Sequence, residues 1–326
     1  MSDPLSDVLD LVQLESVATA RLEAGGAWVL RFPAKPYLKF NAVLKGHCWI
    51  TVDGQAPRRL DSGDTFLMSG APGFVLSAAP CAAGEHAGDG AQLFADAMRG
   101  HSKCVRYGGA ETILVGGGFV FSAASAPLLL DVLPAFLHLP GGSDAAAILR
   151  GTLALLDTEL DGDMPGASVM ARRLADILLV QALRAYVALH GADGAGWMGA
   201  LGDRRIGAAL RQMHGDLARN WSVAELAAHA GMSRSGFALR FRQLVGSGPL
   251  AYLARWRMLV ARSRLRTAGT QVAVPAAQLG YASESAFGAA FKRHFGSAPR
   301  RYWLERNAQT QNGAIMAPSG VDQVRA

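Results

Sequence analysis

Cysteine is scarce in this sequence and follows no recognisable pattern. The 326 residues include only Cys48, Cys81 and Cys104, an odd number without a Cys-x-x-Cys spacing. Such usage is typical of a protein that stays in a reducing compartment, and it argues against a disulfide framework. We therefore expect a cytoplasmic protein.

The sequence also lacks a long apolar run. Its most apolar stretch, residues 174–189, is interrupted by Asp176, Gln181 and Arg184, whereas a bilayer-spanning helix needs about 20 mainly apolar residues. No basic segment followed by an apolar run opens the chain, so nothing indicates a secretory signal. We expect no membrane partner.

Acidic residues are few in one region only. Residues 203–306 contain 17 Lys and Arg against 5 Asp and Glu, whereas residues 1–202 contain 14 against 20. A strongly basic region beside a mildly acidic one is typical of a polyanion-binding domain joined to an ordinary one. The length of 326 residues is enough for two hydrophobic cores.

Residues 222–246 of the basic region predict two short helices joined by a tight turn. Ser222 and Glu225 form a Ser-x-x-Glu capping box, Gly231 adopts a left-handed turn at little cost, and Ser233 caps the second helix. That helix buries apolar residues at spacings of four and three, namely Phe237, Phe241 and Leu244. A short helix whose outer face is basic and polar fits a DNA major groove.

The same pattern returns fifty positions later, over residues 272–296. Identical residues recur at this offset in the pairs Ala227/Ala277, Ser233/Ser283, Ser235/Ser285, Phe237/Phe287, Phe241/Phe291, Gly246/Gly296, Ser247/Ser297, Pro249/Pro299 and Tyr252/Tyr302. A solenoid needs about three or more units, so two units favour a paired helix-turn-helix. Residues 249–267 predict a helix between them, with Pro249 in its first turn. At 1.5 Å per residue this helix spans roughly 28 Å, near the ~34 Å between successive major grooves.

Residues 204–305 resemble the DNA-binding domain of the AraC/XylS family of bacterial transcription regulators. The resemblance rests on Gly280-Tyr281, the SESAF and FKRHFG segments that follow, and Ser297-Ala298-Pro299 with Tyr302. It implies a seven-helix domain that binds double-stranded DNA, and contact with RNA polymerase is a further expectation. The residues implied to face the groove are Arg234, Ser235, Ala238 and Leu239 in the first unit and Glu284, Ser285, Gly288 and Ala289 in the second.

Four cations on or beside these helices add phosphate contacts: Arg240, Arg242, Lys292 and Arg293. The two units differ in their polar side chains. Gly288 and Ala289 stand where donors are expected, and Glu284 faces phosphates that it repels. We therefore expect the first unit to read bases and the second to contact mainly the backbone.

Residues 28–121 consist of short β-prone runs between turns, with Asp53-Gly54 as a hairpin signal. Residues 38–54 followed by residues 60–70 resemble the cupin-like sensor domain of one branch of the AraC family. This implies a barrel that holds a small-molecule effector, and we expect Phe40 and Trp49 to line it. The predicted fold class is thus an α+β multidomain protein, in which a cupin-like β-barrel with appended helices precedes an all-α double helix-turn-helix domain.

The metal ligands of cupin enzymes are missing from this region. Those enzymes use clustered histidines and a carboxylate, but Asn41 and Phe74 stand at two positions where histidine is expected. The histidines that remain are isolated, at His47, His86 and His101. We expect no metal, no cofactor and no catalytic activity, so a metal-free cupin-like enzyme is the least favoured alternative.

A redox-sensing regulator is another alternative, because some related cupin-bearing regulators respond to oxidants. Its candidate thiols are Cys48, Cys81 and Cys104. Free buried cysteines without a function are commoner, and the sequence alone does not decide between these two interpretations.

The expected boundaries place a sensor domain at residues 1–190, a linker at 191–202, the DNA-binding domain at 203–306 and a disordered tail at 307–326. Within the sensor domain, residues 5–17 predict an amphipathic helix, residues 81–109 a glycine-rich loop, and residues from 128 onward a helical part. The clear helices of that part cover residues 151–160 and 169–190. The apolar face of the second either packs against the barrel or forms a homodimer contact.

Overall fold

The computed structural model describes residues 3–12, 14–35, 37–70, 72–80, 87–122, 126–130, 132–162, 164–191, 196–267 and 276–304. The chain divides into two compact units. One comprises residues 8–207, here called the sensor unit. The other comprises the described residues from Ala208 onward together with those up to Asp7, here called the helical unit. None of the described helices is long and apolar enough to cross a membrane.

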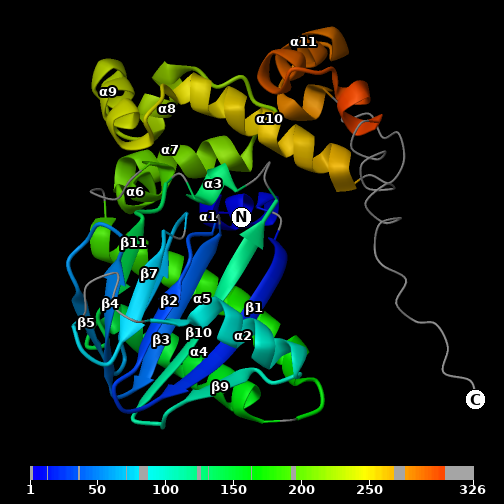
Figure 1. The fold of residues 1–326 in the computed structure, drawn as a ribbon. Coiled ribbons are helices and arrows are strands. Elements are labelled where there is room, and N and C mark those ends of the chain that lie inside the picture. Colours follow the sequence, from blue (N-terminus) through cyan, green and yellow to red (C-terminus); the bar gives the residue numbers. More distant parts are fainter. Residues whose placement is uncertain are drawn as a thin grey trace, which may run out of the picture. The chain divides into compact units, whose positions relative to one another are not determined.

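Two sheets form the body of the sensor unit, which confirms the predicted cupin-like barrel (Figure 1). One sheet has the strand order β11-β6-β3-β10-β1-β9 and the other the order β5-β4-β7-β2-β8. The strands are β1 (Leu14–Ala24), β2 (Val29–Phe32), β3 (Leu38–Lys45), β4 (His47–Val52), β5 (Arg58–Asp61), β6 (Thr65–Met68), β7 (Phe74–Ser77), β8 (Gly88–Asp89), β9 (Cys104–Tyr107), β10 (Thr112–Phe121) and β11 (Phe136–Leu139).

The core of the sensor unit lies between the two sheets, because alternate residues of each strand point inward. In β4, Cys48, Ile50 and Val52 belong to this core, and they pack with side chains such as Leu30 and Phe66. The predicted hairpin at Asp53-Gly54 is present: β4 pairs with β5 in antiparallel fashion, and Gly54 has a positive φ of 79°.

Helices accompany the sheets of the sensor unit. The antiparallel pair α4 (Asp144–Asp161) and α5 (Ala167–His190) lies against the sheet that contains β1 (Figure 1). The remaining helices are α2 (Gly90–Arg99), α3 (Pro127–Leu130) and α6 (Gly196–Gly202), while α1 (Pro4–Leu11) and α7 (Arg204–Gly215) each contain a boundary between the two units. Four of the six residues of the predicted apolar face of α5, Leu174, Leu178, Ala182 and Ala185, are buried, whereas Ile177 and Leu189 are about half exposed.

Four local predictions for the sensor unit differ from the structure. The helix expected over residues 5–17 ends at Leu11, and β1 begins at Leu14. The loop expected over residues 81–109 contains β8, α2 and β9, because Asp89 caps α2 by accepting a hydrogen bond from the backbone N–H of Gln92. Residues 81–86, and with them Cys81 and His86, lie outside the described residues.

The other two differences lie near the end of the sensor unit. Helix was expected from residue 128 onward, but among the described residues of this stretch only 127–130 are helical before residues 136–139 form β11, whose residues alternate in burial and pair with β6. The predicted linker contains α6, because Trp197 and Met198 are buried apolar anchors rather than linker residues.

The helical unit contains the two predicted helix-turn-helix elements on either side of one long helix (Figure 1). Its elements are the end of α7, then α8 (Val223–His229), α9 (Arg234–Val245), α10 (Pro249–Thr267), the 3₁₀ turn η2 (Ala276–Leu279), α11 (Glu284–Phe295) and helical residues 299–304. The long helix α10 has the bounds that the sequence predicts. Pro275 and the tail after residue 304 lie outside the described residues.

The chain's first turn also belongs to the helical unit. Asp7 Oδ2 lies 2.9 Å from His214 Nδ1, and His214 Nε2 lies 2.8 Å from the hydroxyl of Tyr252. The imidazole is buried and stacks on Trp256, with 4.3 Å between the ring centroids. A buried imidazole with both nitrogens bonded has no unmet polar group, so this cluster joins α7, α10 and the N-terminal residues into one body.

Candidate functional site

Two short helices present the predicted DNA-facing residues at the surface of the helical unit. Ser233 caps α9 by accepting a hydrogen bond from Gly236 N, and Ser283 caps α11 in the same way through Ala286 N. The helices end at Gly246 and Gly296, with φ of 81° and 79°, a left-handed conformation that glycine tolerates best. Both helices therefore run from a serine cap to a glycine cap.

Burial along α9 and α11 separates a core face from an outer face. Phe237, Phe241, Phe287 and Phe291 are buried. Of the predicted DNA-facing residues, nine are exposed: Arg234, Ser235, Leu239, Arg242, Glu284, Ser285, Ala289, Lys292 and Arg293. Ala238, Arg240 and Gly288 are partly exposed. All twelve are thus on or near the surface, and their individual roles on DNA stay predictions.

The fifty-residue repeat holds for the second helix of each unit but not for the first. Met232 N donates to Ala227 O in the first turn, and the equivalent bond runs from Tyr281 N to Ala276 O. The equivalent of Ala227 is therefore Ala276, at an offset of 49, and the Ala227/Ala277 pair is a coincidence of sequence. One extra residue separates the turn glycine from the serine cap in the second unit.

Arg257 of α10 connects the two helix-turn-helix units. Its Nε donates to Leu217 O and its Nη2 donates to Arg219 O, and each donor lies 2.8 Å from its acceptor. The same guanidinium lies against Gly280, where a Cβ would come within 2.4 Å of Nη2. One side chain thus contacts both the segment before the first helix-turn-helix unit and the turn of the second. We infer that it helps to fix the distance between the two units.

A cavity of about 270 Å³ lies in the sensor unit beneath α2. Its apolar lining includes Phe94 and Met98 of α2, Leu114 and Val120 of β10 and Leu76 of β7. Its polar lining includes Lys35, Tyr37, Lys39 and Asn41, whereas none of the described lining residues is acidic. The pKa of Lys39 is lowered to about 7, first by burial and then by the nearby charge of Lys35.

Three consecutive glycines of β10 make room for this lining. A Cβ at Gly116 would lie 2.1 Å from the side-chain oxygen of Asn41, and one at Gly118 would lie 3.0 Å from the ring of Tyr37. The sequence signals for the cavity are the run Gly116–Gly118 and the polar residues Lys39 and Asn41 at alternate positions. They gain their meaning from the pairing of β10 with β3. Sequence reasoning missed the cavity.

The two residues expected to line the barrel are not part of this lining. Phe40 alternates with Lys39 and Asn41, so it points to the other side of β3 and packs against Phe119 at 5.3 Å between ring centroids. Trp49 likewise alternates with the core residues Cys48 and Ile50 of β4. Phe40 and Trp49 therefore do not line this cavity, whereas Lys39 and Asn41 of β3 do.

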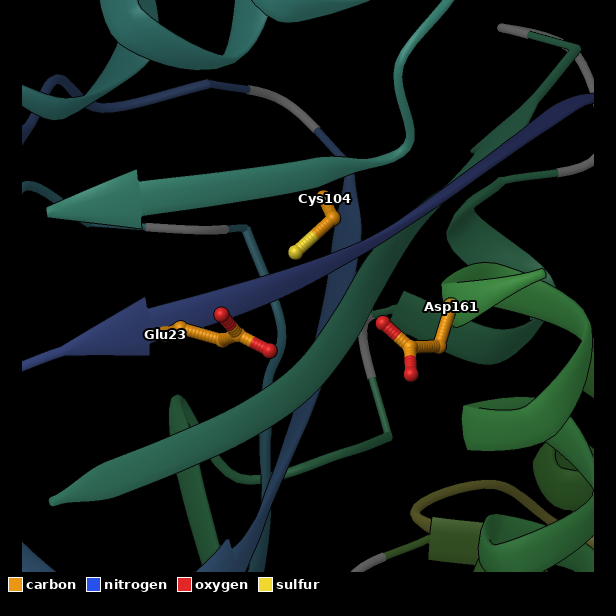
Figure 2. Close-up of side chains that lie close together, drawn as sticks. All are labelled: Glu23, Cys104 and Asp161. Carbon is orange, nitrogen blue, oxygen red and sulfur yellow. The ribbon is translucent and has the colours of Figure 1, made fainter. Parts of the chain in front are cut away.

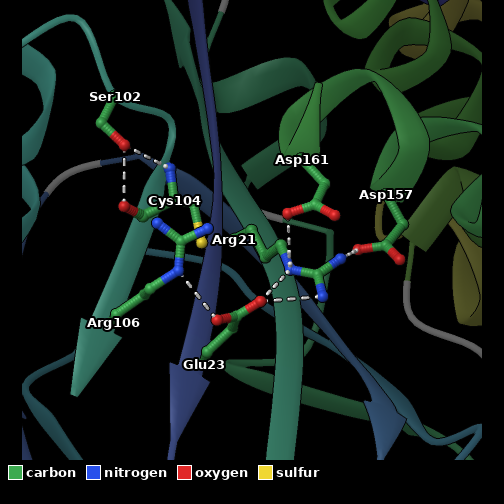
Figure 3. A network of polar contacts seen from close by, with 7 residues as sticks. All are labelled: Arg21, Glu23, Ser102, Cys104, Arg106, Asp157 and Asp161. Atoms are coloured by element: carbon green, nitrogen blue, oxygen red, sulfur yellow. Dashed lines mark hydrogen bonds and ion pairs between the residues drawn. The ribbon is translucent and has the colours of Figure 1, made fainter. Parts of the chain in front are cut away.

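Glu23, Cys104 and Asp161 place one potential metal-ligand atom each within 4.8 Å of one another (Figure 2). Figure 3 shows that arginines already pair with the carboxylates. Arg21 contacts Glu23 at 3.0 Å and Asp161 at 3.9 Å, and it also pairs with Asp157. Arg106 binds the other oxygen of Glu23 at 3.1 Å. The cluster is thus an ion-pair network between β1, β9 and α4, and the arginine charges disfavour a cation.

The described cysteines are poorly suited to redox chemistry. Burial raises the pKa of the Cys48 thiol to about 12, and burial together with Glu23 raises the pKa of the Cys104 thiol. The thiolate is the reactive form, so both groups are held in their unreactive state at neutral pH. Cys81 lies outside the described residues.

Comparison with known proteins gives two family matches that divide the chain. Residues 3–188 match a family described as Cupin, and residues 226–304 match one described as Helix-turn-helix domain. A putative AraC-like transcription regulator of Streptomyces lividans is 40% identical over 301 residues, which cover 92% of this chain and 97% of that protein. The chain belongs to the AraC-like family of transcription regulators.

Other proteins are similar to most or to part of this chain. The HTH-type transcriptional regulator AlkR of Acinetobacter baylyi is 29% identical to this AraC-like regulator over 314 residues, 92% of this chain and 98% of that protein. Among solved structures, the DNA-binding domain of AdpA in complex with a target DNA is 35% identical over 32% of this chain and 95% of that chain, with a TM-score of 0.30. The predicted DNA-binding function of the regulator is confirmed at the level of the family.

Proposed function

We propose that this regulator inserts α9 and α11 into successive major grooves of one operator and that a small molecule in the cavity of the sensor unit alters its occupancy. The observation that carries the DNA part is the duplicated, capped and exposed helix on a common scaffold of α10 and Arg257. The basic character of residues 203–306 supports it, because phosphate contacts supply most of the sequence-independent affinity. Base readout, effector response and any contact with RNA polymerase belong to this proposal.

The test uses the full-length protein. Genomic fragments that it retains are sequenced, a recovered operator is synthesised, and binding is measured between 50 and about 200 mM salt. We expect affinity to fall steeply with salt, by about 0.9 log units per log unit of salt for each phosphate contacted. An operator-binding curve that does not depend on salt contradicts the proposal.

A matched pair of variants assigns the binding to the helical unit. Arg242→Ala removes an exposed cation of α9, whereas Arg59→Ala removes an exposed cation of β5 in the sensor unit. The first should weaken operator binding and lower the salt slope by about one phosphate contact, and the second should leave both unchanged. Equal effects of the two variants would place the interface elsewhere.

We also infer a homodimer, supported by exposed apolar side chains on α4 and α5. Ile148 and Leu155 are exposed at a spacing of seven on α4, and Ile177 is exposed on α5. Exposed apolar patches mark protein interfaces, and we propose that these side chains belong to one. Sedimentation velocity should therefore give a dimer for the wild type and a monomer for Leu155→Asp. A monomeric wild type at micromolar concentration excludes this contact.

A further inference from the structure

A buried amide without a partner points into the cavity of the sensor unit. Asn41 is 7% exposed and lines the cavity, and its Nδ2 has no hydrogen-bond partner among the described residues. A buried donor is stabilised by a hydrogen-bond acceptor, so an acceptor atom of a bound molecule would be favoured at this place. Asn41 therefore marks where the polar end of a ligand binds.

The nearest charged group on the same strand face is Lys39. Its Nζ lies 4.3 Å from the ring centroid of Phe32 and 4.7 Å from that of Phe74, and no ion pair is found for it among the described residues. Cation–π contacts orient an ammonium without neutralising it. The lysine is thus an oriented amine that faces the cavity lining, still has hydrogen-bond donors to offer and is positively charged below its pKa of about 7.

The remaining lining selects the rest of the ligand. Lys35 adds a second positive charge and Tyr37 a hydroxyl, and these are the only other titratable groups among the described lining residues. Beyond them the surface is apolar and includes Phe94 and Met98 of the overlying helix α2. A volume of about 270 Å³ lies just below the range of about 300–1,000 Å³ that is usual for ligand sites. The cavity thus combines a cationic end, an apolar body and room for a compact molecule.

We propose that the cavity binds a compact organic carboxylate, whose oxygens accept hydrogen bonds from Lys39 Nζ and Asn41 Nδ2 and whose apolar part lies against α2. The inference names the chemical class of the effector and so rests on the proposed function. It also gives a role to Asn41 and Phe74, which stand at two positions where the resemblance leads us to expect histidine: both contribute to holding an anion, one as a donor and the other by orienting the lysine.

The test compares carboxylates with their neutral primary amides. Benzoate, hexanoate, cyclohexanecarboxylate and 3-phenylpropionate are each titrated beside the matching amide into the full-length protein by isothermal calorimetry. At least one carboxylate should bind about tenfold or more tightly than its amide, because a hydrogen bond to a charged group is worth about 1.5–3 kcal/mol. If no carboxylate in the set binds more tightly than its amide, the proposal is overturned.

Variants locate the preference. Lys39→Met should abolish the preference for the carboxylate, whereas Lys45→Met, at an exposed lysine of the same strand, should retain it. Asn41→Leu should reduce it without reversing it. Operator binding at fixed salt serves as the folding control for each variant. A preference that survives Lys39→Met overturns the assignment of the site.

The pH dependence gives a measurement on the unmodified protein. The carboxylate needs the protonated lysine, and the pKa of Lys39 is about 7. Between pH 6 and pH 8 carboxylate affinity should therefore fall by up to about tenfold, while amide affinity stays constant. A carboxylate affinity that does not change over this range contradicts the lysine contact.

Operator occupancy, measured with and without each compound, tests the proposed function separately from the anion site. A carboxylate that binds with the expected preference but leaves operator occupancy unchanged supports the anion site and contradicts the effector response. Conversely, an operator response to amides as strong as that to carboxylates supports an effector cavity and overturns the anion proposal.

Discussion

The two helix-turn-helix units place equivalent caps and aromatic residues around helices of the same length, yet they differ in support and in surface chemistry. The first is preceded by an α-helix with a complete capping box, whereas the described part of the second begins with the 3₁₀ turn η2. On its outer face the first carries Arg234 where the second carries Glu284, whereas Arg242 and its equivalent Lys292 are both cations. The comparison teaches that the caps and core residues that expose a helix can stay the same while its exposed side chains change.

The largest expected effect tests whether the two cores are equivalent. Phe241→Ala and Phe291→Ala should each cost about 3–5 kcal/mol of unfolding free energy, because both rings are fully buried and each contacts a tyrosine, Tyr252 or Tyr302. Calorimetry of the full chain should show the transition of the helical unit moving to lower temperature in both variants. Leu239→Ala, at a residue 62% exposed, is the control and should stay within about 0.5 kcal/mol.

The next effect separates the two turns. Gly231→Ala places a side chain at positive φ, which costs about 1–2 kcal/mol, but no atom lies within 4 Å of the new Cβ. Gly280→Ala incurs the same strain, and its Cβ would also lie 2.4 Å from Arg257 Nη2 and 2.8 Å from Ala218 O. Urea denaturation should therefore show the larger loss for Gly280→Ala. Gly248→Ala, which meets no atom within 4 Å and has no positive φ, should be close to neutral.

A third effect concerns DNA directly. Scrambling the operator half-site under α9 should weaken binding more than scrambling the half-site under α11, because a good base contact is worth about 1–3 kcal/mol. Gel-shift titration at one salt concentration measures the two losses. Equal losses, or a greater loss under α11, would show that Lys292 and Arg293 read bases as well as phosphates.

The smallest effect tests the capping box that only the first unit is shown to have. Ser222→Ala should cost about 0.5–2 kcal/mol, because the hydroxyl accepts from Glu225 N at 3.1 Å while Glu225 accepts from Ser222 N at 2.8 Å. The bonds with Ser222 hold the pKa of Glu225 at about 2, below its usual 4.5.

The sign of the pH dependence follows from that depressed pKa. The contribution of Glu225 is fully present above about pH 4.5 and is lost as the pH falls toward 2. The stability difference between wild type and Ser222→Ala, followed by thermal melts between pH 6 and pH 2.5, should therefore shrink as the pH falls. A difference that stays constant with pH would mean that the serine hydroxyl alone provides the cap.

Local patterns predicted the helical unit well because its determinants are short-range. The Ser-x-x-Glu box, the Ser233 cap, the Gly231 turn and the bounds of α10 depend on residues within a few positions of each other. The sequence did not show that the first helices of the two units are offset by 49, because alanine recurs at both Ala276 and Ala277. Only the hydrogen bonds of the turns distinguish the two.

The sensor unit was predicted in outline, but its cavity was not, since the cavity depends on long-range pairing. β9 was missed inside a glycine-rich segment because it gains its hydrogen bonds from β1, about eighty residues away. Phe40 was chosen as a lining residue over Lys39 because aromatic character is visible in sequence and the inward face of a strand is not. The glycines of β10 that open the cavity acquire meaning only once β10 is paired with β3.

The contact between Asp7 and His214 affects the design of fragments and chimeras of this protein. The helical unit is discontinuous in sequence, since it takes its last polar partner for a buried imidazole from the chain's first turn. A fragment that starts at residue 196 therefore lacks part of its own unit, and an affinity tag or deletion at the N-terminus reaches the distant DNA-binding half. Exchange of sensor units between regulators of this kind by a single crossover would sever that bond, so a chimera must be joined at two points, one after Asp7 and one near Ala208.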